Sequence, residues 1–332
     1  MVGATEIARD AGHVSSSAPG NPLSGSRPAP SPVTGWLVTG AGGMLGRDLG
    51  KLLTTINASG LVLADRATLD VSDIDAVRRA VSQLGPRGVV LNAAAWTNVD
   101  AAESQEDDAC AVNGAAVRTL ATACQAAAAA LIHVSTDYVF GGPVSQGVAP
   151  DTVSAYAEDA PTAPINAYGR TKLGGERAVL ELSPETGYVV RTAWLYGRHG
   201  RNFVSTMLDV AASRERVDVV DDQIGQPTWT LDLAKRMIEI GHRQPPPGIY
   251  HATAGGETSW YGLARAAFEE AGLDPGRVRP VSTAAFPRQA LRPARSVLGH
   301  DRWAAAGMAP LGTWRTMLGR AYRAGTFAGQ AT

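Results

Sequence analysis

The sequence predicts an α/β protein in which a doubly wound parallel sheet is joined to a smaller, interleaved C-terminal domain. Its 332 residues exceed the usual size of a single core. A short apolar run, a glycine-rich turn and a helical pattern follow one another at 36–55. Beyond them, strand-like apolar runs alternate with helical runs, and this alternation favours right-handed crossovers between parallel strands.

Composition and charge narrow the class of protein. Hydrophobic residues make up 45% of the chain and charged residues 18%, as in globular proteins. The net charge is −1 without a polybasic segment, which argues against nucleic-acid binding. No apolar run reaches the ~18 residues of a membrane helix. Cys110 and Cys124 lack metal-like spacing and fit two buried thiols in a reducing compartment. We therefore expect a soluble, cytoplasmic protein.

The first 33 residues form a separate segment. Residues 15–35 are rich in Ser, Pro and Gly and lack hydrophobic periodicity, so a disordered tail is expected at 1–33. The segment also lacks the basic and apolar parts of a signal peptide.

The glycine-rich turn has the spacing Gly40-x-x-Gly43-x-x-Gly46, and Met44 and Leu45 open the following helix. Glycine at these positions permits a tight turn, close approach of a pyrophosphate and close packing of the helix on the sheet. The free N–H groups of the helix terminus can bind phosphate. Because the turn lies between a strand and a helix, it predicts a Rossmann-type dinucleotide site.

The second strand, 61-LVLADR-66, ends in an acid and a base. The carboxylate of Asp65 could accept hydrogen bonds from the adenosine ribose. Arg66 could instead face a 2′-phosphate, so these two residues leave the choice between NAD and NADP open.

Polar residues follow a later apolar run, 129-AALIHV-134. Ser135, Thr136 and Asp137 stand where that strand should end, and ligands of parallel α/β sheets bind at the carboxyl ends of strands. These side chains are therefore expected at the edge of a binding site. The neighbouring elements are expected as a strand and turn at 88–95, a helix at 107–129 and a strand at 131–135.

Tyr168 and Lys172 stand four residues apart in the helical segment 164–182, so they share one face of the helix. A lysine ammonium beside a phenol lowers its pKa from ~10, which would let Tyr168 exchange a proton near neutral pH. Lys172 could also hold the nicotinamide-ribose hydroxyls. An isolated pair of this kind is typical of a solvated helix face, but its place downstream of a dinucleotide turn favours chemistry.

These motifs together resemble the extended short-chain dehydrogenases/reductases, and among them the dTDP-4-dehydrorhamnose reductases. The glycines and the Tyr–Lys pair occur throughout the superfamily, whereas STDYVFGG and DDQIGQPTW are far more specific. The resemblance covers most of residues 36–230 and continues more weakly at 286–298. The matching segments are TGAGGMLGRDL, LDVSD, NAAAWTNVDAAES, VNG, HVSTDYVFGG, NAYGRTKLGGE, RTAWLYG, NFVSTML, DDQIGQPTW and FPRQALRPARSVL.

The resemblance implies roles for individual residues. Thr136 would bind the substrate carbonyl, Tyr168 would donate the proton and Lys172 would orient the ribose. The implied cofactor-binding residues are Gly40, Gly43, Met44, Leu45, Asp65, Arg66, Asp70, Val71, Asn92, Ala93, Ala94, Tyr168 and Lys172. The implied substrate-binding residues are Thr97, Val99, Asp137, Tyr138, Trp194 and Gln223.

The resemblance also implies a reaction. Hydride would pass from NADPH, or from NADH, to C4 of dTDP-4-dehydro-β-L-rhamnose, a dTDP-4-keto-6-deoxy-sugar, to give dTDP-β-L-rhamnose. The protein would be a monomer or a homodimer. The dinucleotide-binding domain would comprise 34–190 and 222–248, and the substrate-binding domain 191–221 and 249–332.

Several positions depart from the family pattern or resist assignment. The loop 141–167, between Phe140 and Tyr168, is longer than expected, which could alter the sugar. Arg295 replaces a frequent Asn and weakens any inference of metal-bridged dimers. The six histidines form no ligand spacing, and His133 is expected to be structural, so no metal is predicted. Two interpretations of Arg288, Arg292 and Arg295 are equally compatible with the sequence: contact with nucleotide phosphates, or an ordinary place on the solvated surface.

Two other functions remain compatible with the sequence. The protein could be a reductase or epimerase of another nucleotide-4-keto-sugar, because the shared residues do not read the sugar. It could also be a non-catalytic NADP-binding subunit, since this subfamily resembles the regulatory β subunit of methionine adenosyltransferase. The intact set of Thr136, Tyr168 and Lys172 argues against the second alternative.

Overall fold

The computed structural model describes residues 32–142 and 155–328. The predicted tail at 1–33 therefore lies outside the described residues, apart from its last two positions. Part of the long loop between Phe140 and Tyr168, residues 143–154, also lies outside them. Within the described ranges, no helix is long and apolar enough to cross a membrane.

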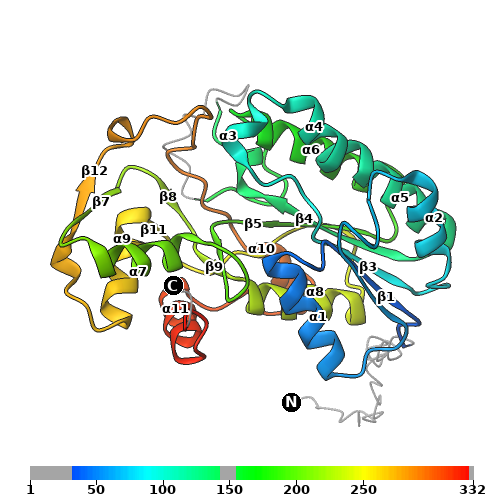
Figure 1. Ribbon diagram of the computed structural model, residues 1–332. Helices are drawn as coiled ribbons and strands as arrows, with labels where there is room; N and C mark the ends of the chain where they lie inside the picture. The colour runs from blue at the N-terminus through cyan, green and yellow to red at the C-terminus, as the bar shows by residue number, and fades with distance from the viewer. Residues whose placement is uncertain (1–31, 143–154, 329–332) are drawn as a thin grey trace, which may run out of the picture. The chain divides into compact units, whose positions relative to one another are not determined.

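A six-stranded parallel sheet forms the centre of the fold, with strand order β10-β5-β4-β3-β1-β2 (Figure 1). The alternation of strands and helices predicts this parallel sheet, and the prediction is confirmed. The strands are β1 Trp36–Thr39, β2 Leu61–Ala64, β3 Val89–Asn92, β4 Ala130–Thr136, β5 Gly187–Thr192 and β10 Gly248–His251.

Helices cover both faces of this sheet, as a doubly wound fold requires (Figure 1). One face packs against α1, α8 and α10, and the other against α2, α5 and α6. Near-continuous apolar strands such as β1 and β3 fit this two-sided burial. The helices are α1 Met44–Thr55, α2 Ile74–Ser82, α5 Ala116–Ala127, α6 Ala167–Leu182, α8 Thr230–Arg243 and α10 Asp301–Ala305.

The segment predicted as one helix at 107–129 is interrupted by a π-helical turn. Here α4 Glu106–Cys110 leads into the π turn Ala111–Ala115, which continues as α5. Inside the turn, the Asn113 amide donates to Thr171 Oγ1 at 3.1 Å and accepts from the Trp96 N–H at 2.9 Å. The position of the Asn113 side chain is thus set by tertiary hydrogen bonds, which helical periodicity in the sequence does not predict. Of the two cysteines, Cys124 is buried but Cys110 is exposed, contrary to the prediction.

The remaining elements gather around α7, α9 and α11, whose apolar faces form two further buried clusters. Short strand pairs link them: β6 with β9, β7 with β12, and β8 with β11. The helices are α7 Phe203–Ser213, α9 Trp260–Glu270 and α11 Trp314–Arg323. The short helix α3 Val99–Ala102 packs instead against α4 and α6. The strands are β6 Leu195–Tyr196, β7 Val217–Val220, β8 Ile224–Gly225, β9 Thr228–Trp229, β11 Thr258–Ser259 and β12 Val278–Val281.

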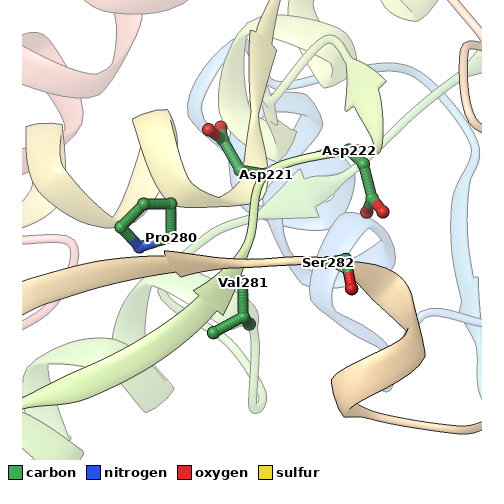
Figure 2. A pocket seen from close by; sticks show the side chains of 5 residues that line it. All are labelled: Asp221, Asp222, Pro280, Val281 and Ser282. Atoms are coloured by element: carbon green, nitrogen blue, oxygen red, sulfur yellow. The ribbon is translucent and has the colours of Figure 1, made fainter.

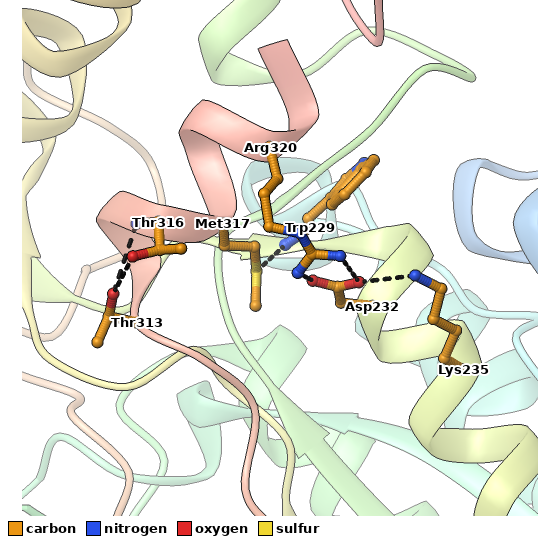
Figure 3. A network of polar contacts seen from close by, with 7 residues as sticks. All are labelled: Trp229, Asp232, Lys235, Thr313, Thr316, Met317 and Arg320. Atoms are coloured by element: carbon orange, nitrogen blue, oxygen red, sulfur yellow. Dashed lines mark hydrogen bonds and ion pairs between the residues drawn. The ribbon is translucent and has the colours of Figure 1, made fainter. Parts of the chain in front are cut away.

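The last helix, α11, is tied to α8 by charged groups (Figure 3). The guanidinium of Arg320 pairs with the carboxylate of Asp232 at 2.7 and 3.2 Å and lies 5.7 Å from the centre of the Trp229 ring. On the other side Lys235 donates to the same carboxylate at 3.2 Å. Because α8 packs on the sheet, these contacts join the C-terminal helix to the sheet layer.

Candidate active site

The carboxyl ends of the parallel strands meet at one edge of the sheet. In the strand register Thr39 of β1 is paired with Asn92 of β3, which is in turn paired with His133 of β4. One step further along, Thr136 ends β4 beside Thr192 of β5. The polar residues that the sequence placed after β4 therefore stand at this edge.

The backbone around the glycine-rich turn is packed so closely that a side chain at Gly40 or Gly46 would clash with it. Gly40 has a left-handed φ of +68°, and a Cβ there would lie 2.6 Å from the Ala94 nitrogen. A Cβ on Gly46 would lie 2.1 Å from the Gly40 carbonyl oxygen. The following helix, α1, begins at Met44 without a side-chain cap. This cradle of backbone and open helix terminus is the shape and polarity that a pyrophosphate requires.

The loop after β2 lies beside the same turn. A Cβ on Gly42 would be 3.6 Å from the Asp65 Cβ. Asp65 Oδ1 accepts from the Ala67 and Thr68 N–H groups at 3.0 Å, and these and the Thr68 hydroxyl lower the pKa of its carboxyl. Asp65 therefore holds its own loop as a charged carboxylate, while Arg66 is exposed beside it.

Of the next two predicted cofactor residues, Asp70 is exposed and Val71 is buried. The Asp70 carboxylate accepts from the Ser72 N–H and hydroxyl at 2.9 and 2.6 Å, and these bonds lower the pKa of Asp70. Leu45 lies in the core, and a Cβ on Gly197 would lie 3.1 Å from the Met44 sulfur.

Tyr168 is placed by the first turn of α6. Asn166 caps this helix, its Oδ1 accepting from the Gly169 N–H at 2.8 Å. A Cβ on Gly169 would lie 2.2 Å from the Tyr138 carbonyl oxygen, so glycine lets the helix approach the segment after β4. The rings of Tyr138 and Tyr168 consequently meet edge to face, with centroids 6.0 Å apart.

The direction of the pKa shift at Tyr168 is opposite to the sequence prediction. Burial and the nearby Asp137 charge raise the pKa of Tyr168 to about 12, against a smaller lowering by a hydrogen bond with Thr136. The residue as a whole is half-buried. The prediction failed because the amine of Lys172 is turned to another partner, so the expected ammonium does not stabilise a phenolate here.

The Lys172 amine is directed toward β4. Its Nζ donates to the Val134 carbonyl oxygen at 2.7 Å and lies 3.3 Å from His133 Nε2. Burial lowers the pKa of Lys172 to about 8, although the Glu176 carboxylate raises it. Desolvation, and then the Lys172 charge, hold the pKa of His133 well below its usual value. His133, expected to be structural, thus touches a predicted catalytic side chain.

Thr136 and Asp137 form one buried hydrogen-bonded unit. The Thr136 hydroxyl donates to Asp137 Oδ1 at 3.0 Å, and the Ser296 hydroxyl donates to Oδ2 at 2.5 Å. Burial raises the pKa of the Asp137 carboxyl to about 6 despite these bonds. The carboxylate that the resemblance places at the sugar is turned into the protein in this structure. Ser296 lies in the weakly matching RPARSVL segment and is not singled out by sequence reasoning.

Ser135 belongs to a buried ion pair behind the site. Glu176 accepts from Arg191 Nε and Nη2 at 2.9 and 2.7 Å, and from the Ser135 hydroxyl at 2.5 Å. The side chains of Arg191 and Glu176 are 2% and 1% exposed. This pair fixes α6 against β4 and β5, which carry the polar strand ends. Its sequence signal is the acid four residues after Lys172, on the same helix face.

Trp194 and Gln223 both contact a second tryptophan, Trp260. The rings of Trp194 and Trp260 are stacked with centroids 3.6 Å apart, and Trp260 Nε1 donates to Gln223 Oε1 at 3.1 Å. Trp194 has a left-handed φ of +46°, which is strained for a bulky residue. A Cβ on Gly225 would lie 2.6 Å from the Trp194 ring, so glycine is required beneath it. Sequence reasoning missed Trp260.

Arg292 approaches the site over Tyr138. Its guanidinium lies 5.9 Å from the centre of that ring and pairs with the Asp100 carboxylate at 3.1 Å. Arg295 pairs instead with Glu257 at 2.6 Å, and Arg288 is exposed. The three arginines therefore separate, and Arg292 is the one in contact with a predicted substrate residue.

The other predicted substrate residues lie at the start of α3, where Thr97 is exposed and Val99 is half-buried. A separate open hollow lies between the ends of β7 and β12 and holds none of the predicted site residues (Figure 2). Its acids, Asp221 and Asp222, accept from Ser259 and Thr283 respectively. Within the described ranges, no cluster of three or more His, Cys, Asp or Glu side chains could hold a metal ion.

Known proteins resemble this chain over most of its length. The model of the RmlD substrate binding domain family matches residues 35–326. The chain belongs to this family. It is 51% identical over 300 residues, 89% of this chain and 95% of the relative, to a dTDP-4-dehydrorhamnose reductase of Streptomyces griseus. It is 50% identical over 287 residues, 86% and 96%, to a dTDP-4-keto-6-deoxy-D-glucose reductase of Streptomyces niveus.

Among RmlD-type solved structures, the dTDP-4-dehydrorhamnose reductase of Bacillus anthracis in complex with NADP superimposes with a TM-score of 0.80 at 35% identity. The match covers 87% of this chain and 98% of that one. Both the resemblance to dTDP-4-dehydrorhamnose reductases and the Rossmann-type fold class are thereby confirmed.

Proposed function

We propose that the protein is an NADPH-dependent reductase of the C4 ketone of dTDP-4-dehydro-β-L-rhamnose, producing dTDP-β-L-rhamnose. The observation that carries the proposal is the hydrogen bond between Tyr168 and Thr136 at the end of β4, in the same parallel sheet whose first strand leads into the glycine turn. The NADP complex of the B. anthracis relative and the name of the S. griseus relative support the cofactor and the substrate.

Bound NADPH would supply the hydride, held by the Gly40–Gly46 turn, the Asp65–Arg66 loop and Lys172. As the ketone oxygen gains negative charge, a positioned acid lowers the barrier by transferring a proton to it. Tyr168 suits this role because its raised pKa keeps the phenol protonated at neutral pH. In the mechanism proposed here, Tyr168 therefore gives its proton to the C4 oxygen.

Thr136 has a hydroxyl that can turn between partners. In the structure it donates to Asp137, so a bond to the substrate oxygen requires rotation away from that carboxylate. Protonation of Asp137, whose pKa is raised to about 6, weakens its hold on the Thr136 hydrogen. Thr136 would then help to stabilise the developing oxyanion.

The substrate side is proposed to comprise Thr97, Val99, Tyr138, Trp194 and Gln223. The stacked rings of Trp194 and Trp260 and the guanidinium over Tyr138 support this assignment, because flat aromatic faces and cations suit a nucleotide sugar. The proposed dinucleotide domain remains 34–190 with 222–248, and the substrate domain 191–221 with 249–332. Strand β10 and helix α10 also pack with the central sheet.

The experiment follows the absorbance of reduced nicotinamide when the purified protein meets dTDP-4-dehydro-L-rhamnose, with NADPH and NADH in parallel. Tyr168→Phe should lower turnover by about a hundredfold to ten-thousandfold while cofactor binding persists. Tyr322→Phe on α11 is the matched control and should keep full activity. Full turnover by Tyr168→Phe would refute the assigned mechanism.

A second substrate is supported by the S. niveus relative, whose name specifies dTDP-4-keto-6-deoxy-D-glucose at a similar identity. The same assay with both keto-sugars gives a ratio of kcat/KM values that assigns the physiological sugar. A higher kcat/KM for the D-glucose derivative would replace the rhamnose proposal but leave the reductase mechanism intact. Cofactor binding without reduction of either keto-sugar would instead favour a non-catalytic role.

A further inference from the structure

A row of buried polar side chains crosses the sheet beneath the candidate site. Thr39, Asn92 and His133 are register neighbours on three adjacent strands, and Lys172 meets the last of them from α6. None of the four residues is more than 2% exposed. Hydrogen-bond directions in such a row are strongly constrained, because a buried polar atom without a suitable partner is costly.

The side-chain amide of Asn92 determines which groups donate and which accept hydrogen bonds in this row. Its Oδ1 accepts from the Thr39 hydroxyl at 2.7 Å and from the Ala94 N–H at 3.2 Å. Because a backbone N–H can only donate, it fixes which end of the Asn92 amide is oxygen. The other end, Nδ2, lies 2.9 Å from His133 Nδ1 and must donate to it. His133 Nδ1 is thus an acceptor, and the neutral ring carries its hydrogen on Nε2.

That Nε2–H group faces the Lys172 amine across 3.3 Å. An ammonium has three hydrogens and no lone pair, so it cannot accept from His133. An uncharged amine can accept this hydrogen and still donate to the Val134 carbonyl oxygen at 2.7 Å. A Cβ on Gly175 would lie 3.2 Å from His133 Nε2, so glycine allows α6 to hold the two groups this close.

We propose that His133 is a positioning residue for Lys172: with its tautomer fixed by Asn92, it presents an Nε2–H that favours the uncharged amine. The lowered pKa values of Lys172 and His133 agree with this arrangement. Only its kinetic consequence rests on the proposed reductase function.

Other charged groups around Lys172 do not replace His133. Glu176 raises the pKa of Lys172, but this carboxylate is already paired with Arg191. Further titratable side chains lie on or beside the elements packed against α6, namely α3, α4, α5, β4, β5 and the turn after β4. They include Asp100, Glu103, Glu106, Asp107, Asp108, Cys110, Arg118, Asp137, Tyr138 and Tyr188. Those on α6 itself include Tyr168, Arg170, Arg177 and Glu181.

The lysine content makes the test direct, because the chain has only Lys51, Lys172 and Lys235. Protein labelled at lysine Nζ should give three NMR titrations, of which two belong to exposed side chains. We expect Lys172 to titrate near pH 8, below the ordinary lysine value of about 10.4. Titration of Lys172 at the ordinary lysine value would overturn the proposal.

His133→Gln tests the cause of this shift. A glutamine amide can present its oxygen to an ammonium, so the Lys172 midpoint should rise by about one pH unit. His242→Gln, an exposed change on α8, should leave it unchanged. An unchanged Lys172 midpoint in His133→Gln would overturn the proposal.

NMR of the wild-type protein labelled at the histidine ring nitrogens tests the tautomer of His133 directly, without any substitution. Nε2 of His133 should carry hydrogen and Nδ1 should not, at all values between about pH 5 and pH 9. Hydrogen on Nδ1, or on both nitrogens, would contradict the proposed tautomer.

The kinetic consequence is separable from these measurements. If the reductase turns over with a charged Lys172, its activity should fall above about pH 8, and His133→Gln should move this limb upward with the NMR midpoint. If the alkaline fall in activity stays at the same pH while the NMR midpoint of Lys172 moves, the kinetic consequence is refuted and only the effect of His133 on the charge of Lys172 stands. Absence of turnover would refute the proposed function and leave the NMR test valid.

Discussion

Glu176→Gln is the perturbation with the largest expected effect on stability. The wild-type carboxylate accepts two bonds from Arg191 and one from Ser135, and both charged side chains are at most 2% exposed. The variant keeps one oxygen acceptor but leaves the guanidinium buried without a counter-charge. Breaking a buried pair in this way typically costs 3–5 kcal/mol, so we expect about that loss in the free energy of unfolding.

The assay is urea unfolding followed by circular dichroism. With a denaturant slope of about 2–3 kcal/mol/M, the expected loss of about 3–5 kcal/mol lowers the midpoint by about 1–2.5 M. Glu181→Gln is the matched control on the same helix, because Glu181 pairs with Arg118 at 3.1 Å and is 62% exposed. That change should cost less than about 1 kcal/mol.

The reasoning would be refuted by equal losses in the two variants. A further check replaces both charged partners, Glu176→Leu with Arg191→Met, since apolar replacement of a whole buried pair is often neutral. The double variant should therefore be more stable than Glu176→Gln. If it is less stable, hydrogen bonding to Ser135 and not charge compensation dominates the pair.

Three smaller predictions follow from local geometry, all measured as free energies of unfolding. Gly174→Ala should stabilise the fold by about 0.5–1 kcal/mol, because a Cβ there has no atom within 4 Å. Gly175→Ala should destabilise the fold, because its Cβ would lie 2.3 Å from the Asn113 carbonyl oxygen. The opposite order of stabilities would contradict this packing. Trp194→Gly should be about 1 kcal/mol more stable than Trp194→Ala, since glycine tolerates a φ of +46°; equal stability would exclude strain there. Asp137 has its folded pKa raised to about 6, so its stabilisation is full below about pH 4 and lost as the pH rises through 6. Asp137→Asn should remove that decline of roughly 2–3 kcal/mol, and an unchanged decline would assign it to another group.

The sequence predicts the parts of the site that depend on neighbouring residues. The glycines of the first turn sit between a strand and a helix within twenty residues, so their function follows from local spacing. Tyr168 and Lys172 share a helix face for the same reason. The structure places the glycine turn between β1 and α1 and both Tyr168 and Lys172 on α6, as expected.

Tertiary contacts decide what the sequence does not reveal. The shift at Tyr168 depends on burial and on Asp137, and neither can be read from the spacing to Lys172. The left-handed backbone of Trp194 accompanies stacking on Trp260, a residue without a motif of its own. The resemblance gave residue identities in these cases but not the direction in which their side chains point.

The bond between Asp137 and Ser296 has a consequence for synthesis. The two residues are 159 positions apart, and ribosomes add about 5–20 residues per second, so the serine is made about 8–30 s after the carboxylate that it binds. During that interval Asp137 has no Ser296 hydroxyl on Oδ2, although the strands β1 to β4 have already been translated. Completion of the site is thus a late event in the life of the nascent chain.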